Sequence, residues 1–359
     1  MPRRKVFVAV SGGVDSSTTA ALLLQGGFDC EGIFMITHER AETAQADAEK
    51  VCRHLQIPLH ILDLRKDFQR IIEYFCDIYQ QGKTPNPCVL CNRLIKFDLL
   101  WDFARRRGAD FLSTGHYAQI RQKDGRPALY QASNADKDQS YVLSMIRREM
   151  LDFILLPLAD CSKEKTRRIA ADFGLHTKHK EDSQEICFIP DRNYIAMLHQ
   201  WRPDIGKPGP VLDTAGNVLG QHEGIFRYTI GQRRGLGIAG GSPLYVVRID
   251  PQSNTVVLGG KEDLLGKKMR IHQINWLIDP PERPFSAKVK IRYNHAGVLA
   301  VVNPGCLMHT AEVIFDQPVS AITPGQAAVL YLADGQDWQV AAGGWIAEAI
   351  KGNEESQTE

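Results

Sequence analysis

The chain of 359 residues is long enough for two or three domains with a substantial buried core. Its 43% hydrophobic and 24% charged residues exclude a largely disordered protein. The 43 Lys and Arg residues nearly balance the 42 Asp and Glu residues, for a net charge of +1, so overall charge does not indicate a nucleic-acid partner. Neither a membrane-spanning run nor a signal peptide is recognisable, and we expect a cytoplasmic protein without a membrane partner.

The first 200 residues alternate between apolar strand-like and amphipathic helix-like segments. Strands are predicted at 5–10, 32–36, 59–64 and 110–114, and helices at 15–25, 42–55, 67–79 and 92–107. Strands separated by helices of this length form βαβ units. The pattern therefore predicts an α/β domain built on a parallel sheet over residues 1–200.

The pattern changes after residue 200. Residues 201–210 are rich in proline and glycine and predict a linker, and short apolar runs between turn residues follow. We predict a small central domain at 201–270 and a β-barrel-like domain at 271–359 that ends in a polar tail at 352–359.

A glycine-rich string, Ser-Gly-Gly-Val-Asp-Ser at 11–16, joins the first strand to the first helix. The glycines permit a tight turn, and a helix N-terminus directs N–H groups toward an anion. Asp15 would repel a phosphate unless a divalent cation lay between them, which favours Mg²⁺. A plain capped turn would explain one of these polar residues but not the whole string. The Walker motif is absent.

The string resembles the signature of the PP-loop ATP pyrophosphatases, which split ATP between its α and β phosphates and adenylate a substrate oxygen. This resemblance implies an adenine contact at Met35, at the end of the second strand. It also implies ATP contacts at Ala9, Val10, Ser11, Gly12, Gly13, Val14, Asp15 and Ser16. A second glycine string at 235–240 matches a dinucleotide motif in letters, but a strand-like run follows it, so we exclude a dinucleotide site.

Two of the eight cysteines, Cys52 and Cys76, lie on apolar stripes of predicted helices, and we expect both in the core. Cys88, Cys91 and Cys187 do not fit such stripes. From the residues alone, these three thiols could form a zinc site with help from His116, a structural cluster, a redox dithiol or a sulfur-transfer centre.

Cys91 is predicted at the N-terminus of the helix at 92–107. There the helix dipole, together with Arg93 and Lys96, would lower the pKa of its thiol.

Further strings follow in a fixed order: T-P-N-P at 84–87 with Cys91-Asn92, G-H-Y at 115–117, K-D-Q-S-Y at 137–141, I-C-F-I at 186–189 and T-P-G-Q at 323–326. Together with the glycine string, they resemble the tRNA-specific 2-thiouridylase family over nearly the whole chain. The resemblance implies an enzyme that adenylates the C2 oxygen of the wobble uridine in tRNAs for Lys, Glu and Gln and replaces it with sulfur.

The same resemblance implies the residue roles. Sulfur from a cysteine desulfurase or relay protein would form a persulfide on Cys187. Cys91 would act as the nucleophile that releases sulfide or closes a transient disulfide. Gly115 would contact ATP. The tRNA would be contacted by Asn86, Pro87, Cys88, His116, Lys137, Asp138, Gln139, Arg292, Tyr293 and Gln326.

Many family members have Asp at the position of Cys88. Either Cys88 takes over proton transfer, or Cys88, Cys91 and Cys187 ligate a [4Fe-4S] cluster with one open iron. Two other functions compete with tRNA thiolation: a PP-loop amide-forming synthetase acting on a small molecule, and a non-catalytic RNA-binding protein.

Near-neutral overall charge hides an uneven distribution. Residues 227–292 contain 12 Lys and Arg against 5 Asp and Glu, whereas residues 293–359 contain 1 against 8. The basic stretch is either a solvated face or a phosphate-binding surface. It includes Arg233, Arg234, Lys267, Lys268, Arg270 and Arg292.

Overall fold

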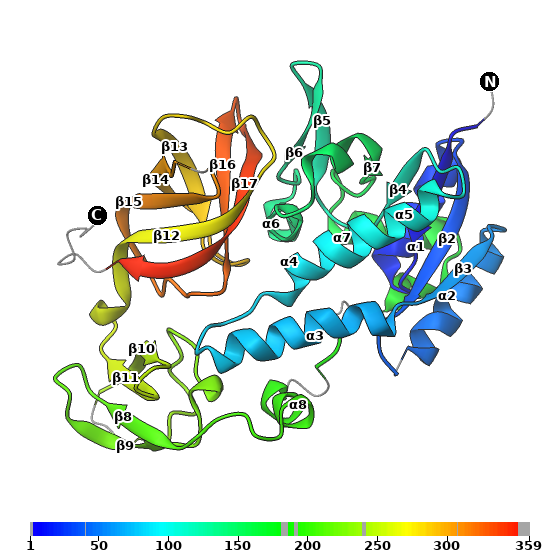
Figure 1. Cartoon of the computed structure of the whole chain (residues 1–359). Coiled ribbons are helices and arrows are strands. Elements are labelled where there is room, and N and C mark those ends of the chain that lie inside the picture. Colours follow the sequence, from blue (N-terminus) through cyan, green and yellow to red (C-terminus); the bar gives the residue numbers. More distant parts are fainter. Residues whose placement is uncertain are drawn as a thin grey trace. The chain divides into compact units, whose positions relative to one another are not determined.

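The computed structural model describes residues 3–39, 41–180, 186–189, 193–238, 242–306 and 308–350 (Figure 1). The chain divides into two compact units. The first comprises Met1–Ile71, Cys88–Phe188 and Ala333–Ala341, and the second comprises Ile72–Pro87, Ile189–Leu332 and Ala342–Glu359. The tail predicted at 352–359 lies outside the described residues.

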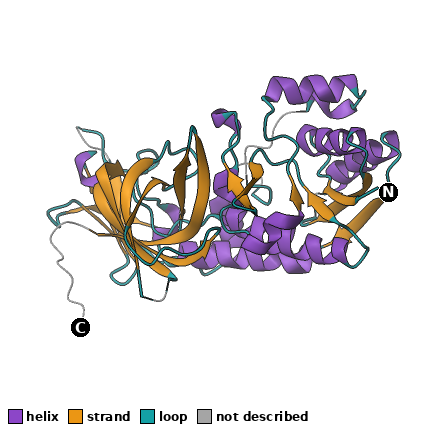
Figure 2. Cartoon of the chain, turned by 90° about the horizontal axis from the view of Figure 1, so that it is seen from above, coloured by secondary structure: helices purple, strands orange, loops and turns teal. Residues whose placement is uncertain are grey.

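The first unit contains a five-stranded sheet of order β3-β2-β1-β4-β7 in which every pairing is parallel. Its apolar central strand β1 is buried because helices cover the sheet (Figure 2). This confirms the predicted α/β fold. The strands are β1 (Lys5–Ala9), β2 (Asp29–Ile36), β3 (Leu59–Asp63), β4 (Phe111–Ser113) and β7 (Ile154–Leu155).

The helices α1 (Val14–Gln25), α2 (Glu42–His54) and α3 (Arg65–Gln80) follow the first three strands, and α7 (Lys163–Asp172) comes after β7. Ala20 of α1 and Val51 and Cys52 of α2 are fully or nearly fully buried in one apolar core with the sheet. Cys76 is also buried, so both core cysteines were predicted correctly. In the described part of the chain, no helix is long and apolar enough to cross a membrane.

One helical boundary was predicted wrongly. The helix expected to begin after Cys91 begins at Pro87, as α4 (Pro87–Cys91), and continues as a π-helix, η1 (Asn92–Leu99), and as α5 (Leu100–Arg105). Proline fits the first turn of a helix because its missing N–H has no partner there. Cys91 therefore lies inside a helical run and not at its N-terminus.

The first unit also contains a hairpin that the sequence analysis missed. Strands β5 (Gln119–Lys123) and β6 (Arg126–Tyr130) are joined by Asp124 and Gly125, both with positive φ, as a tight Asp-Gly turn requires. At its N-terminal end, strand β17 (Asp337–Ile350) pairs Gln339 with Tyr130 of β6.

The second unit begins its β structure with a four-stranded sheet of order β10-β11-β8-β9. The strands are β8 (Gly209–Leu212), β9 (Val218–His222), β10 (Tyr245–Asp250) and β11 (Thr255–Gly259), and they follow helix α8 (Tyr194–Trp201). Gly235 and Gly237 lie in a loop before strand β10, so no helix follows the dinucleotide-like string. Gly240 of that string lies outside the described residues.

Six antiparallel strands form a barrel of order β12-β15-β14-β13-β16-β17, which closes through pairing of β12 with β17. Their inward side chains are buried, as Met269, Val313 and Val340 illustrate. The predicted β region is confirmed. The strands not yet defined are β12 (Leu265–Trp276), β13 (Phe285–Lys290), β14 (Val298–Pro304), β15 (Thr310–Ser320) and β16 (Ala327–Asp334).

Candidate active site

The glycine string forms a tight loop between β1 and α1. Gly12 has φ +73°, and a Cβ on it would lie 2.5 Å from the carbonyl oxygen of Ala44 on α2. Gly13 is the N-cap residue of α1 and provides no side-chain cap. The first N–H groups of α1 are therefore left for an anion.

Two serine hydroxyls hold this loop in shape. Ser16 Oγ accepts a hydrogen bond from the Ser11 N–H at 3.1 Å, and it lies 3.2 Å from the Gly13 carbonyl oxygen, to which it donates. Ser17 Oγ donates to the same carbonyl at 2.7 Å. The conformation of the loop is thus fixed by its own side chains.

Asp15 is paired within the protein. Lys163 Nζ, from the first turn of α7, lies 2.8 and 3.0 Å from the two carboxylate oxygens, and the Tyr117 hydroxyl donates to Oδ1 at 2.7 Å. Lys163 therefore offsets the negative charge of Asp15, so the repulsion of phosphate that suggested a divalent cation is reduced by the protein itself. Mg²⁺ as the counter-ion of ATP stays a prediction.

A second lysine that the sequence analysis missed supports the loop from another direction. Lys180 Nζ donates to the Gly12 carbonyl at 3.0 Å and to Asp47 Oδ2 at 2.8 Å. The hydrogen bond from Lys180 lowers the pKa of Asp47, with a smaller contribution from His176. The bend at Gly12 is thereby tied to α2 and to the segment after α7.

Gly115 lies directly against the glycine loop. A Cβ on Gly115 would be 2.8 Å from the Ser16 nitrogen and 2.9 Å from the Asp15 carbonyl carbon. Glycine is therefore required for this close approach. The next two residues extend the contact, since Tyr117 donates a hydrogen bond to Asp15 and His116 lies within electrostatic reach of Lys96.

The residues predicted to contact adenine lie at the carboxyl edge of the sheet. Val10 follows β1 and donates its N–H to Ile33 of β2 at 2.8 Å, and the half-buried Met35 is near the end of β2. Ligands of open α/β sheets bind at this edge. Ala9, Val10 and Met35 therefore occupy positions that suit a nucleotide, and their contacts with ATP stay predictions.

The structure brings Cys88, Cys91 and Cys187 into one neighbourhood. The pKa of Cys187 is raised to about 12, chiefly by burial and then by Cys91 and Cys88, while Lys96 opposes this increase. Burial likewise raises the pKa of Cys88 and of Cys91, although Cys88 and Cys187 reach the surface. The prediction of a lowered pKa for Cys91 is wrong, because desolvation outweighs Lys96 and no helix N-terminus is present at Cys91.

The π-helix explains why Lys96 faces these thiols. A π-helix bonds residue i to residue i+5, so Lys96 follows Cys91 by one such turn. The adjacent Asn92 donates Nδ2 to the Val142 carbonyl at 2.9 Å, while its buried Oδ1 has no partner among the described residues. π-helices are rare and are often found at functional sites.

His116 is buried and neutral. Burial, reinforced by Lys96, lowers the pKa of this imidazole well below its usual range, and its Nδ1 lies 2.7 Å from Thr114 Oγ1. The string G-H-Y therefore contacts the glycine loop through Gly115 and Tyr117, and its His116 lies near Lys96, which also acts on the three thiols. A tRNA contact by the buried His116 stays a prediction.

Side chains of the K-D-Q-S-Y string form hydrogen bonds that fix the conformation of the loop in which the string lies. Asp138 is buried, and its Oδ1 accepts the N–H groups of Ala132 and Ser140, both at 3.0 Å. Gln139 Oε1 accepts the Tyr117 N–H at 3.0 Å. Asp138 and Gln139 thus position the G-H-Y string. Contacts of Lys137, Asp138 and Gln139 with tRNA stay predictions.

The second unit carries the remaining predicted residues. Gln326 Nε2 donates to the carbonyls of Thr84 at 3.2 Å and Pro85 at 2.9 Å, just before Asn86 and Pro87. Arg292 is exposed and donates to the Ser320 carbonyl at 3.1 Å, and Tyr293 is 38% exposed. All six basic residues of the candidate phosphate surface are exposed.

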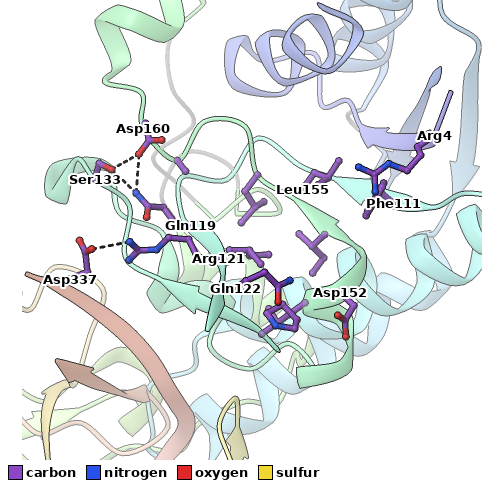
Figure 3. A pocket seen from close by; sticks show the side chains of 16 residues that line it. Arg4, Phe111, Gln119, Arg121, Gln122, Ser133, Asp152, Leu155, Asp160 and Asp337 are labelled. Atoms are coloured by element: carbon purple, nitrogen blue, oxygen red, sulfur yellow. Dashed lines mark hydrogen bonds and ion pairs between the residues drawn. The ribbon is translucent and has the colours of Figure 1, made fainter. Parts of the chain in front are cut away.

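A separate pocket of about 750 Å³ lies beside the β5–β6 hairpin of the first unit (Figure 3). None of the residues that line it belongs to the glycine loop or to the group of thiols. Its polar side chains bond one another: Gln119 Nε2 lies 2.9 Å from Asp160 Oδ1, and Arg121 lies 2.9 Å from Asp337. We assign no ligand to this pocket.

An iron–sulfur cluster on the three cysteines was one of two alternatives for Cys88. In the described ranges, no group of three or more His, Cys, Asp or Glu side chains is arranged to hold a metal ion. The iron–sulfur cluster stays a prediction.

Three family models match consecutive parts of the chain: a tRNA methyl transferase HUP domain at residues 4–191, a tRNA methyl transferase PRC-barrel domain at 198–260 and an aminomethyltransferase beta-barrel domain at 266–346. The chain is similar to the tRNA-specific 2-thiouridylase of Syntrophotalea carbinolica, with 44% identity, 96% of this chain and 99% of that protein being covered. It is 43% identical to the enzyme of the same name from Magnetococcus marinus, over 96% of this chain and 99% of that protein.

Similarity to solved structures is distant. The U34-tRNA thiolase from Methanococcus maripaludis aligns at 18% identity and a TM-score of 0.37, over 56% of this chain and 66% of that chain.

Proposed function

The chain belongs to the tRNA-specific 2-thiouridylase family, and from this premise we propose how its residues carry out the reaction. It is a tRNA sulfurtransferase that uses ATP to replace the C2 oxygen of a tRNA uridine with sulfur. The observation that carries the mechanism is that Lys96 acts both on the three thiols and on His116 of the G-H-Y string, while Gly115 of that string contacts the glycine loop.

The first half-reaction makes the uridine oxygen a leaving group. The N–H groups of the first turn of α1 bind phosphate oxygens of ATP, and the paired Asp15 and Lys163 keep the turn in place. The C2 oxygen attacks the α-phosphorus, and pyrophosphate departs. Mg²⁺ would accompany ATP and neutralise charge on its phosphates.

The second half-reaction transfers sulfur. The terminal sulfur of a persulfide on Cys187 attacks C2, and AMP departs with the oxygen. The Cys91 thiolate then attacks Cys187 Sγ, which breaks the S–S bond to the product and leaves a Cys91–Cys187 disulfide. Alternatively, Cys91 first releases hydrosulfide, which attacks C2. Both routes end in the same disulfide, which a dithiol reductant reduces.

Lys96 lowers the energy of the anions in this step. Burial favours the neutral thiols, so a thiolate or a persulfide anion needs a nearby positive charge. The positive charge of Lys96 lowers the pKa of all three cysteines and so opposes the effect of burial. We assign it the role of stabilising the anionic sulfur.

Membership of the family supports a specific substrate and sulfur donor. The acceptor is the wobble uridine of tRNAs for Lys, Glu and Gln, and the donor is a cysteine desulfurase or a sulfur-relay protein. Arg292, Tyr293 and the exposed basic residues of 227–292 bind the tRNA backbone. Affinity should then fall with increasing salt.

Cys88 has one of two roles. It either exchanges a proton with the reacting uridine, or it joins Cys91 and Cys187 in an iron–sulfur cluster when iron is present. Anaerobic purification followed by iron analysis and ultraviolet–visible spectroscopy decides between them. A colourless, iron-free enzyme with full activity excludes the cluster.

The test of the function is ATP–pyrophosphate exchange with and without tRNA, followed by migration of the tRNA in a mercury-containing gel. Thiolation predicts a retarded tRNA that requires both ATP and a sulfur source. A small-molecule synthetase would instead show exchange that does not depend on RNA and would leave the tRNA unretarded.

A further inference from the structure

Two strings more than 230 residues apart, T-P-N-P at 84–87 and T-P-G-Q at 323–326, lie against each other inside the second unit. The Thr84 N–H donates to the Pro324 carbonyl at 2.9 Å. Gly325 has φ +90°, and a Cβ on it would lie 2.8 Å from the Thr84 carbonyl oxygen. The loop before β16 is therefore shaped to receive Thr84.

The Gln326 side chain completes this contact. Its Nε2 lies 3.2 Å from the Thr84 carbonyl oxygen and 2.9 Å from the Pro85 carbonyl oxygen. A primary amide has two N–H donors. Both are used by these carbonyls, so the nitrogen has no hydrogen left to donate to an RNA.

The T-P-N-P loop depends on such outside support. Pro85 and Pro87 have no N–H, so the loop cannot form a regular hydrogen-bonded ladder of its own. Gln326, in contrast, is held by the barrel: its N–H donates to Thr323, and its carbonyl accepts the Ile346 N–H at 2.9 Å. A rigid element thus supports an irregular one.

We propose that Gln326 is a positioning residue: it fixes the T-P-N-P loop so that Asn86 and Pro87 meet the target uridine, and its effect on the reaction acts through that loop. This inference rests on the proposed function and on the contact of Asn86 and Pro87 with the tRNA that the family resemblance implies. Through Gln326, the C-terminal barrel supports the loop that makes this contact.

The test is Gln326→Met, which keeps the length of the side chain and removes both donors. Single-turnover thiolation at saturating tRNA should fall about 10- to 100-fold, the range expected when a reacting group is displaced by about 1 Å. The Kd for tRNA should change less than about threefold, and hydrogen exchange should rise at Thr84 and Asn86. Gln326→Glu, which places a carboxylate against two carbonyls, should reduce the rate at least as much.

Gln336→Glu, on the exposed turn between β16 and β17 and outside the basic stretch, is the control for the charge change and should leave the rate, the Kd and the exchange unaltered. Slow exchange in strand β13 of the barrel shows that each variant is folded. An increased Kd with a normal single-turnover rate would overturn the inference in favour of a direct tRNA contact. If the proposed function itself were wrong, the unaltered protein would not thiolate tRNA at all.

Discussion

The glycine loop and the group of thiols lie in the same unit, but only the glycine loop is already in the state that its proposed step requires. The loop is preorganised: Asp15 is paired with Lys163 and Tyr117, and Gly12 is held by Lys180. The thiols have raised pKa values and so are protonated at neutral pH. Adenylation can therefore use a fixed site, whereas sulfur transfer must await a charge change at the cysteines.

The largest effect should come from the group of thiols. Cys187→Ser removes the persulfide carrier and should lower tRNA thiolation at least ~10³-fold, as loss of a covalent nucleophile does. ATP binding, measured by equilibrium dialysis, should be unchanged because the glycine loop is untouched. The buried Cys161→Ser is the matched control. Retained thiolation in Cys187→Ser would refute the persulfide assignment.

Lys163→Met should impair the glycine loop and leave the thiols intact. This substitution leaves the half-buried Asp15 carboxylate without its cation, and the unpaired charge should disturb the first turn of α1. We expect tRNA-dependent ATP–pyrophosphate exchange to fall on the order of 10²-fold. Persulfide loading of Cys187 should be normal. Lys165→Met, exposed on the same helix, is the control; equal losses in both variants would contradict the role of Lys163.

The sequence predicted the glycine loop better than it predicted the surroundings of the thiols. The glycine string and the order of the other strings predicted the ATP loop, and the structure places Gly115 against it. Lys163 and Lys180 were missed because they are about 150 residues away and in no recognisable pattern. The environment of Cys91 was predicted wrongly because local sequence indicated neither a helix start at Pro87 nor a π-helix. Both depend on tertiary packing.

A smaller effect concerns the pH dependence of the thiols. Because burial raises the pKa of Cys187 to about 12, its alkylation rate should increase about tenfold per pH unit from pH 7 to 9 without a plateau. Lys96→Gln should slow alkylation of Cys187 and Cys91 about tenfold or less at every pH in that range. The exposed Lys66→Gln is the control. A plateau below pH 9 would show that the thiol is not desolvated in solution.

The smallest expected effect is that of Cys88→Asp, which restores the residue that many family members have at this position. If Cys88 transfers a proton, Cys88→Asp should retain thiolation within about threefold, because a carboxylate performs general acid–base catalysis. Cys88→Ala should be slower, by about 10²-fold. A steady-state comparison of both variants under anaerobic conditions measures this difference. Equal, complete loss in both, together with loss of bound iron, would favour the cluster.

The central claim is that one sulfur atom passes from Cys187 to tRNA only after ATP has activated the uridine. The direct measurement is a single turnover with ³⁵S-persulfide loaded on Cys187, followed by mercury-gel separation of the tRNA and quantification of AMP. We predict that label enters tRNA only with ATP and that one AMP forms for each sulfur transferred. Transfer without ATP, or label that stays on the protein while AMP accumulates, would contradict the account.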